Sequence, residues 1–268
     1  MSPFFALVLG VVEGFTEYLP VSSTGHLVLM SYLLGDSGEG AKAFDIVIQL
    51  GAILAVVVHY RALLLERVSG LFTRDPRAIS LAVALALGFL PAAVVGVLLR
   101  RTIKEHLFGP VPVAFALLVG GIVMIAIERY RKARSRPGLD GLEHVTPRRA
   151  LLIGVGQCFS LWPGSSRSMC TIVAGQLTGL STATAAEFSF LLALPTLMAA
   201  TLYEAVKSRH ELMAAGAGLD LAIGMVISFL VAWAVIAGFL QYLKHRGLEP
   251  FGYYRIALAA LVFFVVLR

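Results

Sequence analysis

Residues 10–27, "GVVEGFTEYLPVSSTGHL", combine an apolar helix pattern with two carboxylates, a proline break and a cluster of hydroxyls. Glu13 and Glu17 are four residues apart, so on a helix both carboxylates lie on one face and can reach one ligand. At mid-bilayer, an isolated charge costs on the order of 2.5 kcal/mol or more unless a cation or a polar cavity compensates. The stretch therefore predicts a buried polar site. The alternative is that both glutamates lie at the water interface and are solvated.

The whole chain has the composition of a membrane protein. Of its 268 residues, 58% are hydrophobic and 14% are charged, with a mean hydropathy of +0.85; in soluble domains about a quarter are charged. No polar block is large enough to fold separately, so residues 1–268 are predicted to form a single membrane domain. Six membrane spans are predicted, at about 42–60, 78–99, 111–129, 185–204, 219–243 and 251–267.

Two further apolar stretches, 2–38 and 150–182, are each interrupted midway by Pro, Ser and Gly. Neither half of either stretch is long enough to cross a membrane alone. Broken helices at membrane depth are tolerated only where they are buried in protein or line a wet cavity. Each stretch is therefore predicted to form a re-entrant broken-helix pair.

The two broken stretches resemble each other. "GVVEGFTEYLPVSS" from Gly10 and "GVGQCFSLWPGSS" from Gly154 share a Gly-Val start, a Phe, a proline and a Ser pair, at an offset of 144 residues with one extra residue in the first copy. The same offset pairs "FDIVIQLGAILAVVVHY" from Phe44 with "FSFLLALPTLMAATLYE" from Phe188. Chance similarity between apolar segments is the alternative explanation, and the shared offset argues against it.

These patterns predict an all-α integral membrane fold, with six transmembrane helices plus two re-entrant broken-helix pairs, arranged as two inverted repeats, about 1–130 and 145–268. An odd number of spans in each repeat inverts the second copy relative to the first. The two broken pairs would then enter from opposite faces and meet near the midplane, where transporters of this architecture bind substrate.

The distribution of Lys and Arg predicts the orientation. The predicted loops 61–77, 128–149 and 244–255 carry fourteen of these residues, against seven in the segments expected on the opposite side. The positive-inside rule places the first group in the cytoplasm, so the first broken pair enters from the external face. This rule also accounts for the net charge of +6, and no nucleic-acid partner is expected.

Polar groups follow the first break, in "PVSSTGH". Ser22, Ser23 and Thr24, followed by a glycine at a helix start, suit phosphate binding through hydroxyls and backbone N–H groups. Helix capping explains one of the serines equally well. His26 adds a proton-transfer group beside potential nucleophiles, although a lone membrane histidine is more often a packing residue.

The second break, "PGSSRS" (163–168), adds an arginine. The planar guanidinium of Arg167 matches phosphate oxygens, and Ser166, Ser168 and Thr171 supply further donors. The alternative is an internal ion pair between Arg167 and one of the two glutamates of the first break. The two interpretations are compatible if substrate displaces part of the pair.

The glutamates have two candidate roles. Glu13 and Glu17 could hold a hard divalent metal, Mg²⁺ or Ca²⁺, which prefers oxygen ligands. Alternatively, one of them could act as a general base. Together with the guanidinium and the hydroxyls, either arrangement suits phosphoryl transfer, which depends on positioning and charge neutralisation.

At these residues the chain resembles the undecaprenyl-diphosphate phosphatase family, the bacitracin-resistance type of integral membrane phosphatase. The resemblance covers nearly the whole length and is carried by "EGFTEYLPVSSTGH", "FDIVIQLGAILAVVV", "WPGSSRS", "EFSFLLALP" and the "YR" of "PFGYYRIAL". It implies metal-dependent removal of the terminal phosphate of a polyprenyl diphosphate in the bacterial plasma membrane, which recycles the lipid carrier for peptidoglycan synthesis. The sequence does not decide whether the protein forms a homodimer.

The resemblance also implies roles for individual residues. Glu13 and Glu17 match the acidic motif, Arg167 the phosphate-binding arginine, and Ser23 and His26 the positions of nucleophile or proton transfer. In the favoured mechanism Ser23 attacks phosphorus while His26 or Glu17 takes its proton; direct attack by water is the rival. A transporter or flippase of an anionic or phosphorylated lipid is the competing function, because inverted repeats also build carriers.

Overall fold

The computed structural model describes residues 3–34, 39–107, 109–134, 138–210 and 218–266. Within these ranges the regular structure is helical, and the one β-type contact is an isolated bridge between Leu139 and Leu180. The helices are α1 (Pro3–Thr16), α2 (Ser23–Leu34), α3 (Glu39–His59), α4 (Arg61–Phe72), α5 (Pro76–His106), α6 (Pro110–Arg134), η1 (Leu142–His144), α7 (Pro147–Gln157), η2 (Cys158–Leu161), α8 (Arg167–Leu177), α9 (Thr182–Lys207), α11 (Leu219–Leu243) and α12 (Glu249–Val266).

Four helices of the described chain, α5, α6, α9 and α11, are long and apolar enough to cross a membrane. The end of α3 and the whole of α4 make a fifth candidate as a pair bent by 74°. The prediction of six spans is therefore confirmed for four helices. Predicted span 42–60 falls on α3, and predicted span 251–267 falls on α12, which is not among these candidates.

The predicted loops were too long, because helices extend into them. Segment 61–77 was expected to be a loop, but Arg61–Phe72 forms α4. Its apolar side chains Leu65, Val68 and Phe72 are exposed, as expected of a helix that lies along an apolar boundary. Charged residues had marked this segment as a loop, yet most of them are good helix formers.

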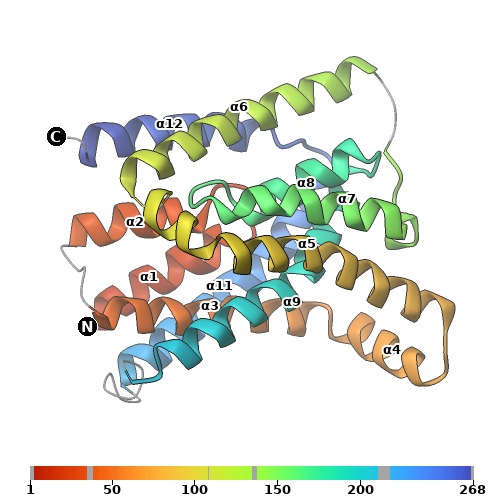
Figure 1. Ribbon diagram of the computed structural model, residues 1–268, viewed down its shortest axis with the longest axis horizontal. Coiled ribbons are helices and arrows are strands. Elements are labelled where there is room, and N and C mark those ends of the chain that lie inside the picture. The colour runs from red at the N-terminus through yellow and green to blue at the C-terminus, as the bar shows by residue number, and fades with distance from the viewer. Residues whose placement is uncertain (1–2, 35–38, 108, 135–137, 211–217, 267–268) are drawn as a thin grey trace.

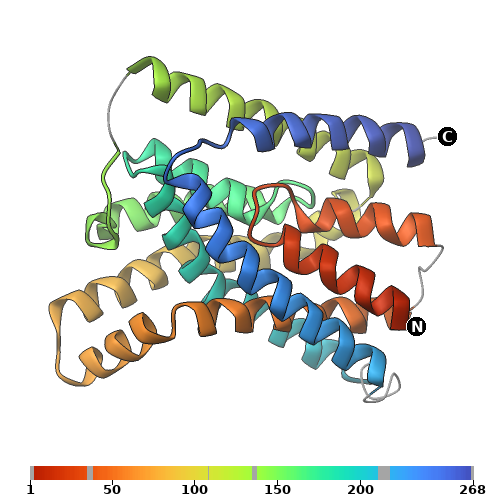
Figure 2. The same ribbon diagram turned by 180° about the vertical axis from the view of Figure 1, so that it is seen from behind.

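Two broken helix pairs enter the bundle from opposite ends (Figures 1 and 2). The outer ends of α1 and α2 lie at the edge that holds the N-terminus, and the outer ends of α7 and α8 lie at the opposite edge. Their connecting turns meet in the middle of the molecule. This places the polar residues of both breaks close together although about 150 positions separate them in the chain.

The two breaks share an unusual backbone conformation. Ser22 and Ser166 have φ of 73° and 71°, the left-handed region that non-glycine residues rarely adopt. Each serine caps the following helix: Ser22 Oγ accepts from the Gly25 amide at 3.3 Å, and Ser166 Oγ accepts from the Met169 amide at 3.2 Å. Sequence matching had paired Ser23 with Ser166. The shared backbone geometry instead pairs Ser22 with Ser166, at the full 144-residue offset.

Glycines allow the outer half of each pair to pack closely on a long helix. A Cβ on Gly10 of α1 would lie 2.7 Å from the backbone oxygen of Gly224 in α11. A Cβ on Gly154 of α7 would lie 2.7 Å from the backbone oxygen of Gly88 in α5. Small residues at such crossings let helix backbones approach within van der Waals contact, which is a main source of helix association in membranes.

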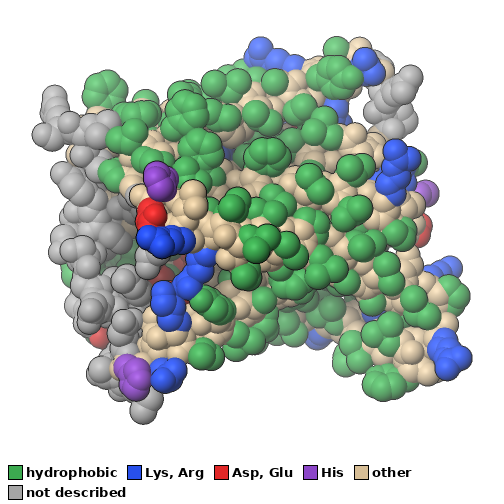
Figure 3. Space-filling model, viewed as in Figure 1, with side chains coloured by type: hydrophobic (Ala, Val, Ile, Leu, Met, Phe, Trp, Pro, Cys, Tyr) green, Lys and Arg blue, Asp and Glu red, His purple; other side chains and the backbone are tan. Residues whose placement is uncertain are grey.

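The outer surface is apolar over a broad area. Figure 3 shows hydrophobic side chains across the face viewed, with Lys and Arg gathered toward the two ends. Exposed apolar residues on the long helices include Leu90, Val97 and Leu98 of α5 and Ile122 of α6. An exposed apolar area of this size fits contact with hydrocarbon.

The glycine contact predicts a stability difference between two similar substitutions. Gly10→Ala forces a methyl group against the α11 backbone, which we expect to destabilise the fold by about 1–3 kcal/mol. The control is Gly238→Ala, because a Cβ on Gly238 meets nothing within 4 Å, and removing a helical glycine there should stabilise by about 0.5–1 kcal/mol. Thermal unfolding in detergent, followed by circular dichroism, measures both. Equal unfolding temperatures for the two variants would contradict this account of the α1–α11 contact.

Candidate active site

A buried ion pair joins the two breaks. Arg167, at the start of α8, donates from Nη2 to Oε1 of Glu17 at 3.2 Å. Both side chains are more than nine-tenths buried, so the charges have lost most of their hydration and depend on each other. The ion pair that the sequence suggested as an alternative role for Arg167 is therefore present.

Ser23 completes this contact from the first turn of α2. Its Oγ donates to the second carboxylate oxygen of Glu17, Oε2, at 2.7 Å. Glu17 thus accepts from the guanidinium on one oxygen and from the hydroxyl on the other. A carboxylate that holds a serine hydroxyl at this distance is placed to take its proton.

Ser189 of α9 and Thr171 of α8 hold the arginine in place. Nη1 of Arg167 donates to the backbone oxygen of Ser189 at 2.9 Å and lies 3.2 Å from its Oγ. Ser189 Oγ is in turn 2.7 Å from Oγ1 of Thr171. Ser168 Oγ donates to the backbone oxygen of Leu19 at 2.9 Å, so it ties α8 to the first break. Ser168 and Thr171 therefore use their hydroxyls within the protein.

The remaining predicted phosphate-binding residues have mixed surroundings. Ser22 is buried, and its Oγ caps α2. Ser166 caps α8 and lies 3.0 Å from Ser168 between their Oγ atoms. Thr24 is exposed in the first turn of α2. The capping alternative given for the first break therefore holds for Ser22, and Ser166 caps α8 in the same way.

Two buried polar groups in this cluster have no hydrogen-bond partner in the described structure. Both carboxylate oxygens of Glu13 are buried and unpaired, and so is Nε of Arg167. Buried polar groups are normally satisfied, so each such group needs an explanation. Here one is a carboxyl group and the other a cationic donor, so a ligand that carries both a cation and an anion could satisfy them.

His26, in the first turn of α2, directs its ring nitrogens to Ser22 and to Tyr254 of α12. Its Nδ1 is 2.7 Å from the backbone oxygen of Ser22, and its Nε2 is 2.6 Å from the hydroxyl of Tyr254. Of the two proton acceptors that the sequence offered for Ser23, the structure therefore places Glu17 against the hydroxyl.

Sequence reasoning missed two residues that hold this cluster. Ser189 was visible only as a single polar residue in the otherwise apolar run "FSFLLALP". Arg255 is fully buried in α12 and donates to four backbone oxygens, at distances of 2.9–3.4 Å, on Pro20, Gly164, Ala116 and Leu117. Pro20 and Gly164 belong to the two breaks, so one guanidinium fastens both turns. A basic residue inside an apolar span was the signal, and it had been counted toward orientation.

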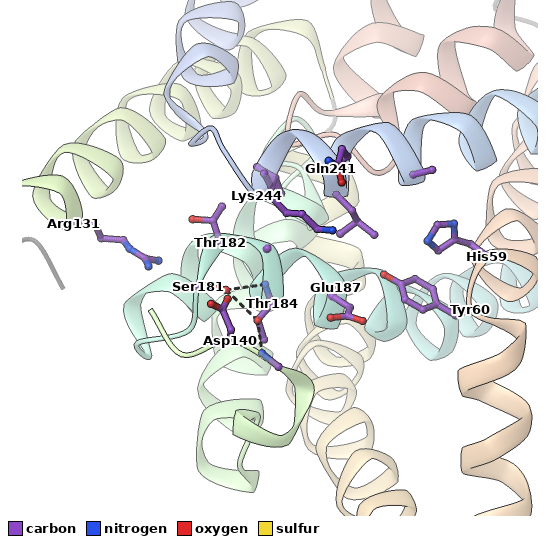
Figure 4. Close-up of a pocket in the computed structure, with 15 residues that line it drawn as sticks. His59, Tyr60, Arg131, Asp140, Ser181, Thr182, Thr184, Glu187, Gln241 and Lys244 are labelled. Atoms are coloured by element: carbon purple, nitrogen blue, oxygen red, sulfur yellow. Dashed lines mark hydrogen bonds between the residues drawn. The ribbon is translucent and has the colours of Figure 1, made fainter. Parts of the chain in front are cut away.

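A cavity of about 870 Å³ lies at the ends of several helices and apart from this cluster (Figure 4). Cations and carboxylates both line it, and the hydroxyl of Tyr60 points into it. The charged and titratable lining residues are His59, Arg131, Asp140, Glu187 and Lys244. Because two carboxylates oppose two fixed cations there, the lining does not select a ligand of either charge.

The fold and the site define a class: a helical membrane protein with a buried serine–carboxylate–guanidinium cluster between two broken helices. The chain matches the family described as "Bacitracin resistance protein BacA" over residues 6–261, and it belongs to that family. It is 60% identical to the undecaprenyl-diphosphatase of Sorangium cellulosum over 97% of this chain and 85% of that protein. It is 48% identical to the undecaprenyl-diphosphatase of Maridesulfovibrio salexigens over 98% of both chains. The protein is therefore a bacterial multi-pass membrane protein.

The Arg255 clamp predicts a loss of stability on a conservative change. Arg255→Lys keeps the charge, but one ammonium cannot reach the carbonyls that lie around the separate edges of the planar guanidinium. Buried carbonyls left without donors should cost about 2 kcal/mol or more. The matched control is Arg101→Lys, because Arg101 is exposed and makes only an i, i+4 surface pair with Glu105, worth about 0.5 kcal/mol or less. An unchanged thermal midpoint for Arg255→Lys in detergent would show that the clamp contributes little.

Proposed function

We propose that this protein hydrolyses undecaprenyl diphosphate to undecaprenyl phosphate and inorganic phosphate, which recycles the lipid carrier for peptidoglycan synthesis and confers bacitracin resistance. The observation that carries the proposal is the contact chain Ser23–Glu17–Arg167, which joins a nucleophile, a proton acceptor and an anion-binding group. Relatives named undecaprenyl-diphosphatase, 60% and 48% identical over nearly the whole chain, support it.

The geometry supports attack by Ser23. Its Oγ forms a bond to the terminal phosphorus, the bond from phosphorus to the bridging oxygen breaks, and the lipid monophosphate leaves. The hydroxyl proton passes to Oε2 of Glu17, 2.7 Å away. Water then attacks the phosphoserine, the Oγ–phosphorus bond breaks, inorganic phosphate leaves, and Ser23 recovers a proton. Attack by water without the serine intermediate is the rival route.

Arg167 supplies positive charge to the transferred group. Two sides of its guanidinium are held, by Glu17 and by Ser189, while Nε is buried with no hydrogen-bond partner among the described residues. A phosphate oxygen would satisfy that donor, and a guanidinium held in advance loses little freedom when the transition state forms. Fixed donors of this kind stabilise developing charge more effectively than mobile ones.

The carboxylates fit a divalent metal, Mg²⁺ or Ca²⁺. Among the described residues, Glu13 is 1% exposed and has no hydrogen-bond partner for either oxygen. The same residues hold no group of three or more His, Cys, Asp or Glu that could bind a metal. Mg²⁺ is commonly held by one or two carboxylates together with substrate phosphates. Glu13 would be the main ligand and Glu17 the second; when bound, the cation would neutralise charge on the diphosphate.

The proposed membrane arrangement has six spans, two re-entrant pairs and two inverted repeats, about 1–130 and 145–268. Several observations support it: the hairpins enter from opposite ends, Ser22 and Ser166 share their positive φ, and α1 packs on α11 as α7 packs on α5. We place the site open to the external face, from the distribution of Lys and Arg. A carrier would need binding groups only, so the Ser23–Glu17 hydrogen bond favours hydrolysis over transport.

The function is tested by phosphate release from a polyprenyl diphosphate by purified protein in detergent. We expect turnover with Mg²⁺ or Ca²⁺, loss of turnover in EDTA, and recovery when either ion is added back. The reason is that a charged Glu13 in a buried position needs a cation to compensate it. Folded protein that releases no phosphate with both ions present would overturn the proposal. Full turnover in EDTA would leave hydrolysis standing and remove the metal.

Two substitutions test the contact chain. Glu17→Gln and Arg167→Ala should each lower kcat by about a hundredfold or more, because each removes charge from the reacting centre. Glu143→Gln is the matched control for the first, because Glu143 is exposed in η1, and its kcat should stay at the wild-type value. Circular dichroism and size exclusion verify folding, since breaking a buried pair is itself destabilising. Near-normal turnover in either site variant would place the active site elsewhere.

A further inference from the structure

Tyr254 makes a contact with His26 that packing alone does not explain. The hydroxyl of Tyr254 lies 2.6 Å from Nε2 of His26, and the two rings are parallel within 6°, with centroids 5.6 Å apart. Tyr254 is 47% exposed, so burial alone does not hold its ring against His26. The contact joins α12 to the first turn of α2.

The hydrogen bonds fix the tautomer of the imidazole. Nδ1 of His26 is 2.7 Å from the backbone oxygen of Ser22, which can only accept, so Nδ1 carries a proton. In the neutral ring, Nε2 then has the lone pair and accepts from the Tyr254 hydroxyl. Both ring nitrogens are used, and the imidazole bridges Tyr254 to the Ser22 carbonyl.

The carbonyl that His26 holds belongs to the strained residue of the first break. Ser22 has φ of 73°, and a conformation of this kind persists only where surrounding contacts impose it. The next residue is Ser23, whose hydroxyl contacts Glu17. The direction in which Ser23 leaves the turn therefore depends on how firmly the Ser22 peptide is held.

Arg255 fastens the same turn from the neighbouring position of α12. Its Nη1 donates to the backbone oxygen of Pro20 at 3.3 Å. The adjacent residues Tyr254 and Arg255 thus hold two carbonyls of one turn, the first through His26 and the second directly. The buried arginine fixes α12 against the turn, which sets the position of the tyrosine relative to the imidazole.

We propose that Tyr254 is a positioning residue of the site: its hydroxyl orients His26, and His26 in turn holds the Ser22 peptide so that Ser23 faces Glu17. This role rests on the proposed function and adds to it a residue that touches neither substrate nor Ser23. In this role His26 positions the turn and does not take the proton of Ser23, because both of its ring nitrogens are hydrogen-bonded, to Ser22 and to Tyr254.

The test compares two neighbouring tyrosines. Tyr254→Phe keeps the stacked ring and removes only the hydroxyl. Tyr253→Phe is the matched control, because Tyr253 is 50% exposed and its hydroxyl bonds to Arg129 and Glu249 on the surface. We expect Tyr254→Phe to lower kcat about tenfold with KM unchanged, which is the size of effect expected for the loss of one positioning hydrogen bond, and Tyr253→Phe to match the wild type.

A double-mutant cycle shows whether the effect passes through the imidazole. His26→Asn keeps a donor near the Ser22 carbonyl and removes Nε2. In that background, Tyr254→Phe should cause no further loss. Wild-type kcat in Tyr254→Phe would overturn the proposal, and so would a tenfold loss that persists unchanged in the His26→Asn background.

One readout does not require turnover. In protein labelled with ¹⁵N-histidine, the His26 ring signals, assigned by their loss in His26→Asn, should show a proton on Nδ1 in the wild type and a mixture of tautomers in Tyr254→Phe. If the wild type itself releases no phosphate, the proposed function fails while this spectrum still tests the contact. Identical His26 spectra in the wild type and in Tyr254→Phe would overturn the contact itself.

Discussion

The structure depends on one buried contact, the ion pair of Glu17 with Arg167. The two residues come from turns that enter the bundle from opposite ends, so neither charge has a partner until both hairpins are in place. An unpaired charge at this depth is costly, whereas the pair with Ser23 and Ser189 around it is satisfied on most sides. The same contact therefore stabilises the meeting of the hairpins and builds the candidate active site.

The backbone of both turns adopts a strained conformation at one serine each. Ser22 and Ser166 adopt positive φ, which turns the chain sharply enough to start α2 and α8 with Ser23 and Arg167 facing the same region. Such strain is stable only if other contacts over-determine it. Arg255 provides that constraint, because it donates to carbonyls of both turns at once. A residue far from the reacting groups in the chain thus controls their placement.

Some polar groups of the site have no partner within the described structure. Arg167 offsets one of the two carboxylates, so Glu13 remains as an unpaired group. A protein that needed these residues for folding alone would gain stability by replacing Glu13 with an apolar side chain. Under the proposed function, a ligand with positive charge would lie against Glu13, and one with negative charge would accept from the open Nε of Arg167. A metal diphosphate has both.

Much of the architecture could be predicted from residue patterns. The apolar runs identified the long helices α5, α6, α9 and α11, because a membrane requires about twenty apolar residues in a row. The prolines and serines located both breaks, since such residues interrupt a helix locally. Helix ends were less predictable: charged segments such as Arg61–Phe72 continue as helix, because charge marks exposure to water and does not by itself end a helix.

The sequence by itself determined that this is a membrane protein with two polar breaks carrying two glutamates, hydroxyls and an arginine, because composition and spacing are local properties. Only the tertiary structure decided which groups meet: that Ser23 faces Glu17, that His26 faces Tyr254, and that Arg255 spans both turns. Those contacts join residues separated by up to 235 positions. They follow from how the hairpins cross in space, and no local pattern encodes that crossing.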